Sequence, residues 1–370
     1  MMKILIFGFS KISYMPYARF YLENLDIQNN EVHFVFWNRD LKEENVDELS
    51  GIDLHEFAYY QEDDCSKLKK IKGFSRYRKY ALKKLKEINP DFIIVLHTLP
   101  GVLLANKLTK KFKGKYIFDY RDFTYEDFLP FKKIVHRLVG NAHATFVSSD
   151  AFRKFLPNKQ SNIYTSHNIL SSDLNYCSPK KELIRDGAHI RISFWGFIRH
   201  EELNREIIRK ISQDDRFELH YYGREQQIAL NLKKYATDLG SKNIFFHGAY
   251  LPQERYIFAE KTDIIHNIYC DKNMSNAMAN KYYDGLVFKI PQICMQNSYM
   301  GIKAESNGIG KQVDPYSDNF CDALYDYFSQ IEEKSFFENI EKEHEKIVHE
   351  YNSGTSFLKV LLSNSRDKGE

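Results

Sequence analysis

The stretch NKYYDGLVFKIP, residues 280–291, decides the fold because of the runs on either side of it. Residues 263–269 form a short, β-branched apolar run before it, which predicts a buried strand. Residues 271–276 read as a polar loop, and Asn280 stands where a helix N-cap is expected. A second apolar strand is predicted at residues 291–295. The segment is therefore expected to form a strand, a loop, a short helix and a strand.

A unit of this kind opens its helix N-terminus at the carboxyl edge of the sheet, where free amides and the helix dipole attract phosphate. Lys281, in the first turn, would add a positive charge. Asp284 lies one turn further on, so the two side chains share a face. A carboxylate there can accept two hydrogen bonds from a ribose diol. The pattern predicts a nucleotide-diphosphate site, the alternative being a plain capped helix with a solvated Lys/Asp pair.

The same stretch resembles the NKxxEYxxxGxP segment of GT-B glycosyltransferases, nearest to glycosyltransferase family 4. This resemblance implies that Asp284 binds the ribose of a sugar nucleotide. There are two departures: Asn276 stands where the family often has a second glutamate, and Lys289 stands where it has a glycine. The resemblance covers nearly the whole chain. It implies an α/β fold of the GT-B type, with two Rossmann-like domains whose parallel sheets face a central cleft.

The length of 370 residues is enough for two domains. We expect an acceptor domain at residues 1–170, a linker at 171–187 and a nucleotide-sugar domain at 188–350. Residues 351–370 are expected to return to the first domain, by analogy with GT-B enzymes.

Composition and charge exclude several classes of protein. The net charge of +3 argues against a nucleic-acid partner. No run approaches the roughly 18 apolar residues of a membrane span, and the first apolar run is too short for a signal peptide. The cysteines are odd in number and widely spaced, which predicts reduced thiols in a cytoplasmic protein. They are Cys65, Cys177, Cys270, Cys294 and Cys321.

Polar residues follow several predicted strands of the N-terminal half, as in an open parallel sheet that builds a cleft. The run at residues 3–7 continues into Gly8 and Ser10, and the run at 92–96 ends at His97. GT-B enzymes use the first of these loops near the acceptor. We therefore assign Gly8, Ser10 and His97 to the acceptor side, although a lone histidine is more often structural.

The segment YIFDYRDF, residues 116–123, resembles a family segment that usually carries a histidine at the reaction centre. Arg121 falls near that position, with Asp122 beside it and Asp119 two residues before it. The resemblance implies that these three residues are catalytic. A structural ion pair among them is the alternative.

The predicted strand at residues 189–195 runs into a turn, Gly196-Phe197-Ile198-Arg199, that resembles the first glycine turn of the family's second domain. Gly196 would let the backbone approach a phosphate, and Arg199 could bind it bidentately. The alternative is a surface arginine after a tight turn. Gly223 and His247 follow the next two strands, and the family segment around His247 lies against the nucleobase. With Asn280, Lys281 and Asp284 they complete the expected donor site.

Residues 67–88 carry ten lysines and arginines and one acid, Glu87, while their apolar residues recur at three- and four-residue spacing. One interpretation is a crossover helix with a solvated basic side. A second is docking to an anionic membrane surface, which is worth about 1 kcal/mol per basic residue. A third is nucleic-acid binding, which the apolar face formed by Phe74 and Tyr77 disfavours because these rings would not form an exposed stacking platform.

The predicted function is transfer of a sugar from a nucleotide-diphosphate donor to a glycan acceptor, lipid-linked, in surface polysaccharide synthesis such as capsule or O-antigen assembly. No D-x-D motif occurs, so we expect a metal-independent hexosyltransferase (EC 2.4) with no cofactor and no metal ligands. It would be cytoplasmic and peripheral at the inner face of the plasma membrane. The alternatives are a non-catalytic nucleotide-sugar-binding homologue and a sugar-nucleotide epimerase of the same fold.

Overall fold

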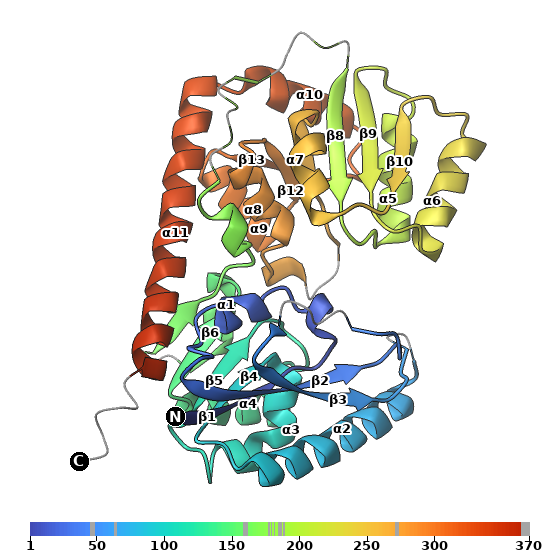
Figure 1. The fold of residues 1–370 in the computed structure, drawn as a ribbon. Helices are drawn as coiled ribbons and strands as arrows, with labels where there is room; N and C mark the ends of the chain where they lie inside the picture. Colours follow the sequence, from blue (N-terminus) through green and yellow to red (C-terminus); the bar gives the residue numbers. More distant parts are fainter. Residues whose placement is uncertain are drawn as a thin grey trace. The chain divides into compact units, whose positions relative to one another are not determined.

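The computed structural model describes residues 1–44, 49–62, 65–157, 162–176, 189–270 and 274–363, with residues 178, 180, 182, 183 and 187. The chain divides into two compact units (Figure 1). Unit 1 comprises Met1–Ser171 and His349–Glu370, and unit 2 comprises Ser172–Val348. Cys177 and much of the expected linker at 171–187 lie outside the described residues, as do residues 271–273 of the expected polar loop and 364–370 of the C-terminal segment.

Unit 1 is built on a seven-stranded parallel sheet of order β3-β2-β1-β4-β5-β6-β7. The strands are β1 (Met2–Phe7), β2 (Asn30–Asn38), β3 (Ile52–Ala58), β4 (Phe92–Leu96), β5 (Tyr116–Tyr120), β6 (Ala144–Val147) and β7 (Ile163–Thr165). The helices are α1 (Ala18–Leu22), α2 (Lys67–Ile88), α3 (Thr98–Leu108) and α4 (Leu129–Asn141). All five residues of β4 are buried. Continuous apolar strands of this kind are typical of a parallel sheet covered on both faces.

Unit 2 repeats this architecture with a six-stranded parallel sheet of order β10-β9-β8-β11-β12-β13. The strands are β8 (Ile190–Trp195), β9 (Phe217–Tyr222), β10 (Ile244–Gly248), β11 (Ile264–Asn267), β12 (Gln292–Met295) and β13 (Gly310–Val313). The helices are α5 (Glu201–Ile211), α6 (Gln227–Asp238), α7 (Arg255–Glu260), α8 (Asn280–Val287), α9 (Tyr299–Ser306) and α10 (Phe320–Gln330). The predicted strand–loop–helix–strand unit is confirmed as β11, α8 and β12, and β11 pairs in parallel with β12.

The last helix, α11 (Glu333–Ser363), is continuous, and its residues from His349 onward belong to unit 1. Tyr351 lies edge-on to Phe20, with ring centroids 5.0 Å apart. Phe357 stacks on Tyr164 at 4.5 Å. These contacts pack the C-terminal part of α11 against α1 and β7 of unit 1.

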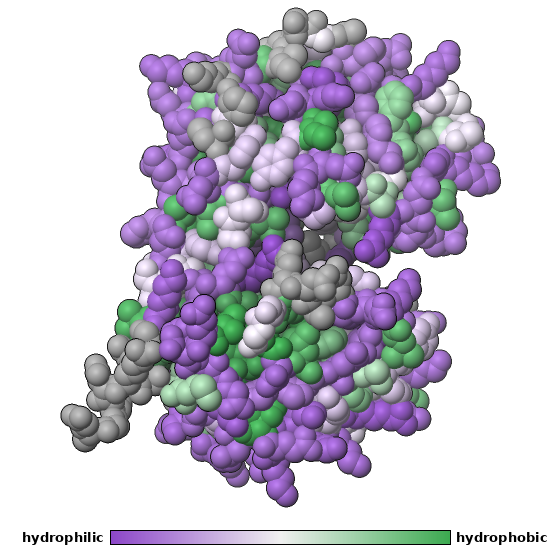
Figure 2. Space-filling view, in the orientation of Figure 1, coloured by the Kyte–Doolittle hydropathy of each residue, from purple (hydrophilic) through white to green (hydrophobic). Residues whose placement is uncertain are grey.

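The surface of the molecule is mainly hydrophilic on the face that Figure 2 shows. Among the described residues, no helix combines the length and the apolar character needed to cross a membrane.

Candidate functional site

Two glycines shape the turns that follow β8 and β9. Gly196 has a φ of 116°, in the region that favours glycine. A Cβ atom at Gly196 would lie 3.5 Å from Nζ of Lys281, and one at Gly223 would lie 2.2 Å from the carbonyl oxygen of Gly196. The missing side chains therefore let the two turns approach each other and bring Gly196 next to the first turn of α8.

Lys281 is a buried cation, 8% exposed, whose Nζ lies 4.3 Å from the ring centroid of Phe194 and 5.4 Å from that of Tyr269. Burial lowers the pKa of Lys281 to about 8; Asp284 opposes this shift and Arg199 adds to it. Within the described part of the chain, its Nζ has no hydrogen-bond acceptor. A buried ammonium in this situation is costly unless a charged or polar group pairs with it. The position therefore favours an anionic ligand.

Two histidines near Lys281 were not identified from the sequence. His266 is fully buried, and its Nδ1 accepts a hydrogen bond from the N–H of Ile268 at 3.1 Å, so the ring proton is on Nε2. Burial lowers the pKa of His266 to about 3, with Lys281 contributing, and its Nε2 has no hydrogen-bond partner among the described residues. His200 occupies the N-cap position of α5 with a φ of 58° and also lowers the pKa of His266. Neither histidine lies in a motif, so no sequence signal pointed to them.

The expectation that Asn280 caps α8 is wrong. Asn280 is the first helical residue and is exposed, while Ala279 takes the N-cap position with the extended backbone that this position needs. Alanine has no side-chain acceptor, and no side-chain cap bond is present. The first amides of α8 are therefore not used by a cap, which suits an anion at this helix end.

Asp284 lies in a buried network rather than at an open surface. Its Oδ1 accepts a hydrogen bond from Arg255 Nη1 at 2.5 Å, and its Oδ2 accepts one from Trp195 Nε1 at 2.6 Å. Arg255 Nη2 also donates to Asp173 at 2.9 Å. Asp284, Arg255 and Asp173 are 5%, 8% and 1% exposed. The carboxylate thus already has a structural role, and its contact with ribose stays a prediction.

The backbone at Lys289, where the resemblance implies a glycine, adopts a left-handed conformation. Its φ is 54°, in the left-handed region that glycine adopts without strain. The backbone here therefore has a conformation that favours glycine, the residue that the resemblance implies at this position, although the side chain is that of lysine.

His247 lies at the wall of an aromatic pocket of about 440 Å³ in unit 2. Its ring stacks on Tyr222 with centroids 4.2 Å apart and an interplanar angle of 10°. Flat rings on a pocket wall suit a planar heterocycle. The lining residues are Arg191, His220, Tyr222, His247, Gly248, Ala249, Tyr250, Glu254, Ile257, Phe258 and Lys261.

Two of the three residues predicted as catalytic in unit 1 form a buried ion pair. Arg121 Nη1 lies 3.1 Å from an Asp119 oxygen, and these side chains are 4% and 0% exposed. Arg121 also donates to Ser166 and to Asn168, and its guanidinium lies 4.1 Å from the ring centroid of Tyr17. The ion pair that the alternative interpretation named is therefore present, and Arg121 also joins the end of β5 to the segment after β7.

The third residue, Asp122, pairs with His97 instead. His97 Nε2 lies 2.9 Å from Asp122 Oδ2, and His97 Nδ1 accepts from the N–H of Leu99, so the proton on Nε2 is donated to the carboxylate. The Asp122 side chain is 57% exposed and that of His97 is 21% exposed. His97 has a φ of 81°, a strained conformation that is enriched at functional sites. The structure thus joins two residues that the sequence assigned separately.

The first loop contributes little open surface at Gly8. A Cβ atom there would lie 2.6 Å from Met15 Cε, and the Gly8 carbonyl accepts from Tyr77 at 2.6 Å. Ser10 is partly buried. Phe9 between them stacks on the His97 ring at a centroid distance of 6.4 Å, which connects this loop with His97 and Asp122.

No protein-family model and no curated protein matches the chain, but solved structures do. One is the lipopolysaccharide outer core galactosyltransferase WaaB in its apo form, with 13% identity, a TM-score of 0.61, and coverage of 97% of this chain and 100% of that one. The Anabaena protein Alr3699/HepE in complex with UDP and glucose matches with 12% identity, a TM-score of 0.65, and coverage of 97% and 99%. A putative UDP-N-acetylglucosamine 2-epimerase from Listeria monocytogenes matches with 12% identity, a TM-score of 0.59, and coverage of 91% and 90%. With the two parallel sheets, these likenesses show that the chain has the GT-B fold.

Proposed function

We propose that this protein is a glycosyltransferase that moves a sugar from a nucleotide-diphosphate donor to a glycan acceptor. The observation that carries the proposal is the convergence in unit 2 of a buried ammonium, Lys281, with the Gly196 turn and the uncapped N-terminus of α8. These groups together fit a diphosphate. The similar HepE structure holds UDP and glucose, which supports a nucleotide-sugar donor here.

Stabilising the leaving diphosphate is the main task that we assign to unit 2. Lys281, Arg199 and the first amides of α8 would supply it, each cation contributing about 2–4 kcal/mol in the transition state. The chain has no D-x-D motif, which supports a reaction without a metal ion. Arg255 and Trp195 use two of the roughly four lone pairs of Asp284, and we propose that ribose hydroxyls donate to the others.

Accepting a proton from the acceptor hydroxyl is the task that we assign to Asp122. His97 donates to one of its oxygens and so orients the carboxylate, which is more than half exposed. A positioned carboxylate of this kind is a suitable general base. Asp119 and Arg121 would act through their buried ion pair, by holding the loop that carries Asp122.

The donor site is tested by titrating UDP into the full chain and into an Arg199→Ala variant, with calorimetry as the readout. Losing a charged hydrogen bond costs about 1.5–3 kcal/mol, so Kd should rise about 10- to 150-fold. Arg209→Ala, in the last turn of α5, is the matched control because it pairs with Glu206 outside the site. Equal UDP affinity in both variants would contradict the assignment.

The acceptor we propose is a lipid-linked glycan of surface polysaccharide synthesis, such as capsule or O-antigen. It would be reached by peripheral attachment at the inner, cytoplasmic face of the plasma membrane. Support comes from the helix predicted at residues 67–88, which forms as α2 with its basic side exposed. Leu68 and Ile71, in its first turns, are 80% and 63% exposed among those lysines. Apolar tips within a basic face suit an anionic bilayer.

This attachment predicts that the protein co-sediments with vesicles containing anionic lipid and not with neutral vesicles. A Leu68→Ser, Ile71→Ser variant should lose most of this binding while it keeps its affinity for UDP. Equal sedimentation with both kinds of vesicle would contradict the proposal.

An epimerase acting on the sugar nucleotide is the second candidate, favoured by the likeness to the putative Listeria epimerase. It would form a new sugar nucleotide without an acceptor. The transferase would instead need an acceptor glycan, and it would release one free nucleotide diphosphate for each sugar that it transfers. A homologue that only binds nucleotide sugars would do neither. Product analysis with and without acceptor glycan separates the three.

A further inference from the structure

The loop between β5 and α4 inverts the usual distribution of polar and apolar side chains. Glu126 is 3% exposed, and its Oε2 accepts a hydrogen bond from the N–H of Thr124 at 2.5 Å. Tyr125, Phe128 and the first helical residue, Leu129, are 49%, 65% and 60% exposed. A single exposed apolar side chain is ordinary, but a group of them beside a buried carboxylate is informative. We call Tyr125, Phe128 and Leu129 the apolar tip.

Phe128 contributes little to the stability of unit 1. It occupies the N-cap position of α4 and makes no side-chain cap hydrogen bond. Serine, threonine, aspartate and asparagine are favoured at this position, because a side-chain oxygen accepts from a free amide of the first turn. Since Phe128 is 65% exposed, it also lies largely outside the core. A large apolar side chain placed in this way indicates a role at the surface.

The apolar tip lies at the same edge of the unit 1 sheet as the start of α2. The strands are parallel, so α2, α3 and α4, which follow β3, β4 and β5, all begin at the carboxyl edge. α3 packs against both α2 and α4, and the three helices cover one face of the sheet (Figure 1). Leu68 and Ile71, in the first turns of α2, therefore border the same edge as the apolar tip. His97, at the N-cap of α3, and Asp122, just after β5, lie at this edge too.

The charges of these helices favour an anionic partner. α4 carries Lys132, Lys133 and Arg137 and no acid. Lys132 and Lys133 outnumber Asp127, the exposed acid just before the helix. α2 adds its exposed basic side at the same edge. Tyrosine and other large apolar side chains beside lysines and arginines suit the interface of an anionic bilayer.

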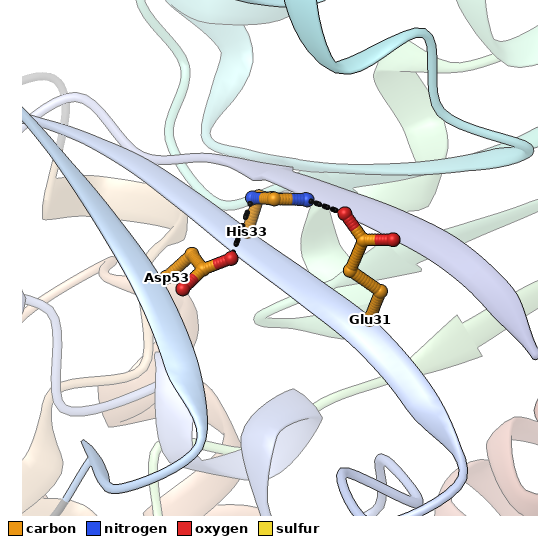
Figure 3. A group of neighbouring side chains, drawn as sticks. All are labelled: Glu31, His33 and Asp53. Atoms are coloured by element: carbon orange, nitrogen blue, oxygen red, sulfur yellow. Dashed lines mark hydrogen bonds and ion pairs between the residues drawn. The ribbon is translucent and has the colours of Figure 1, made fainter.

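The amino ends of β2 and β3, at the other edge of the sheet, carry charged side chains instead. Figure 3 shows His33 between Glu31 and Asp53, with one carboxylate at each ring nitrogen. The Asp53 side chain is 69% exposed. Charged groups are costly to move from water into hydrocarbon, so this edge suits water. Unit 1 thus has one edge that fits a bilayer surface and one that does not.

We propose that the apolar tip enters an anionic bilayer together with the start of α2, and that the acceptor is therefore a lipid that carries only a short glycan. This inference rests on the proposed function, because it takes Asp122 as the base for the acceptor hydroxyl. Tyr125 is three residues from Asp122, which limits the distance between their Cα atoms to about 11 Å. The N–H of Phe128 donates to the carbonyl of Tyr125 at 2.9 Å, and such a turn brings the two Cα atoms within about 7 Å of each other.

Asp122 is consequently within about 18 Å of Phe128, measured between Cα atoms. A hydroxyl on a short lipid-linked glycan stays close to the bilayer surface and can reach a carboxylate held there. The growing end of a long glycan is far from that surface. The reaction would therefore be an early transfer in the assembly of the glycan on its lipid.

Tryptophan placed in the full chain measures the depth of this loop in vesicles of phosphatidylcholine and phosphatidylglycerol. Phe128→Trp should lose emission when the acyl chains carry bromine, because its indole would lie in the bilayer. Phe123→Trp, next to Asp122, should lose emission only when the lipid headgroups carry a nitroxide. Asp53→Trp, exposed at the other edge of the same sheet, is the matched control and should respond to neither label. The chain without an added tryptophan gives the background.

A Phe128→Ser, Leu129→Ser variant tests the same surface without a probe. It should partition into these vesicles about 10- to 100-fold more weakly than the wild type, because two exposed apolar side chains are lost. Its melting temperature should not fall, because serine is a favoured N-cap residue.

Three results would overturn the insertion: no vesicle binding by the wild-type chain, no quenching at position 128 by the acyl label, or wild-type partitioning of the double serine variant. Quenching at position 128 without quenching of Phe123→Trp by the headgroup label would overturn the short-glycan acceptor, since Asp122 would then lie too far from the bilayer. UDP titration of the same samples reports on the donor site by itself, so a failure here is distinguishable from a failure of the proposed function.

Discussion

Replacing Asp284 by alanine should destabilise unit 2 as well as weaken nucleotide binding. The Arg255–Asp284 pair has an N–O distance of 2.5 Å, and its side chains are 9% and 7% exposed. Removing one member of a buried pair costs about 3–5 kcal/mol. Because Asp173 still holds the other side of the guanidinium at 2.9 Å, we expect the lower end, about 3 kcal/mol.

The same substitution leaves the indole N–H of Trp195 without its acceptor at 2.6 Å. A buried donor left unsatisfied costs a further 1–3 kcal/mol or so. Asp284→Asn keeps an oxygen that can face Trp195, so it should cost about 3 kcal/mol where Asp284→Ala costs about 4–6 kcal/mol. The geometry predicts that Asp284→Ala loses more unfolding free energy than Asp284→Asn. This order is as informative as the size of either loss.

Urea unfolding followed by tryptophan fluorescence measures this effect, because the chain has two tryptophans and Trp195 is the one in unit 2. A Trp37→Phe background leaves Trp195 as the sole reporter. The matched control is Asp238→Asn, since Lys234–Asp238 has the same 2.5 Å separation but side chains 74% and 57% exposed. The exposed Lys234–Asp238 pair should contribute only about 0.3–0.5 kcal/mol to the free energy of unfolding.

The reasoning would be refuted if Asp284→Ala and Asp238→Asn lowered the free energy of unfolding equally. Burial would then not determine the strength of the pair. If Asp284→Ala were as stable as the wild type but no longer bound UDP, Asp284 would instead be a ligand-binding group with no structural role.

Three further predictions concern the proposed site. UDP affinity should fall as pH rises through about 8, where Lys281 loses its proton, and Lys281→Arg should remove this dependence because arginine stays charged; calorimetry across that range tests it. Asp122→Asn should slow sugar transfer roughly 10²- to 10⁴-fold with unchanged UDP affinity. An equal loss of transfer rate and of UDP affinity would argue against Asp122 as a general base. Gly223→Ala places a Cβ 2.2 Å from the Gly196 carbonyl oxygen, so it should lower stability by about 1–3 kcal/mol, and an unchanged melting temperature would show that the turn has room.

The parts of the fold that the sequence predicted are those with a strong local pattern. Residues 67–88 show helical periodicity on one face, and α2 spans those residues. The apolar run before α8 is short and β-branched, the run after it is short and apolar, and they form β11 and β12. A parallel sheet buries both faces of its central strands, so these strands stand out as continuous apolar runs.

The missed features depend on the sheet edge or on residues far apart in the chain. β3 is an edge strand in which exposed Asp53 and Glu56 interrupt the apolar residues, so it produced no strand signal. The Arg255 network joins positions 82 and 29 residues away from Arg255. No local pattern connects residues at such separations, and only the tertiary fold brings α7, α8 and the segment before β8 within reach of the Arg255 side chain.

The sequence assigned Lys281 and Asp284 the same task because they share one helix face, but their surroundings differ. Asp284 is compensated within the protein, since Arg255 and Trp195 each donate to one of its oxygens. Lys281 lies against the rings of Phe194 and Tyr269, and no acceptor for it is found among the described residues. A buried charge that the fold already pairs contributes to stability, whereas one that it leaves without an acceptor gains most when an anion arrives. In the proposed donor site, the electrostatic attraction for a diphosphate would therefore come chiefly from Lys281, and Asp284 would act first by holding in place the helix that presents Lys281.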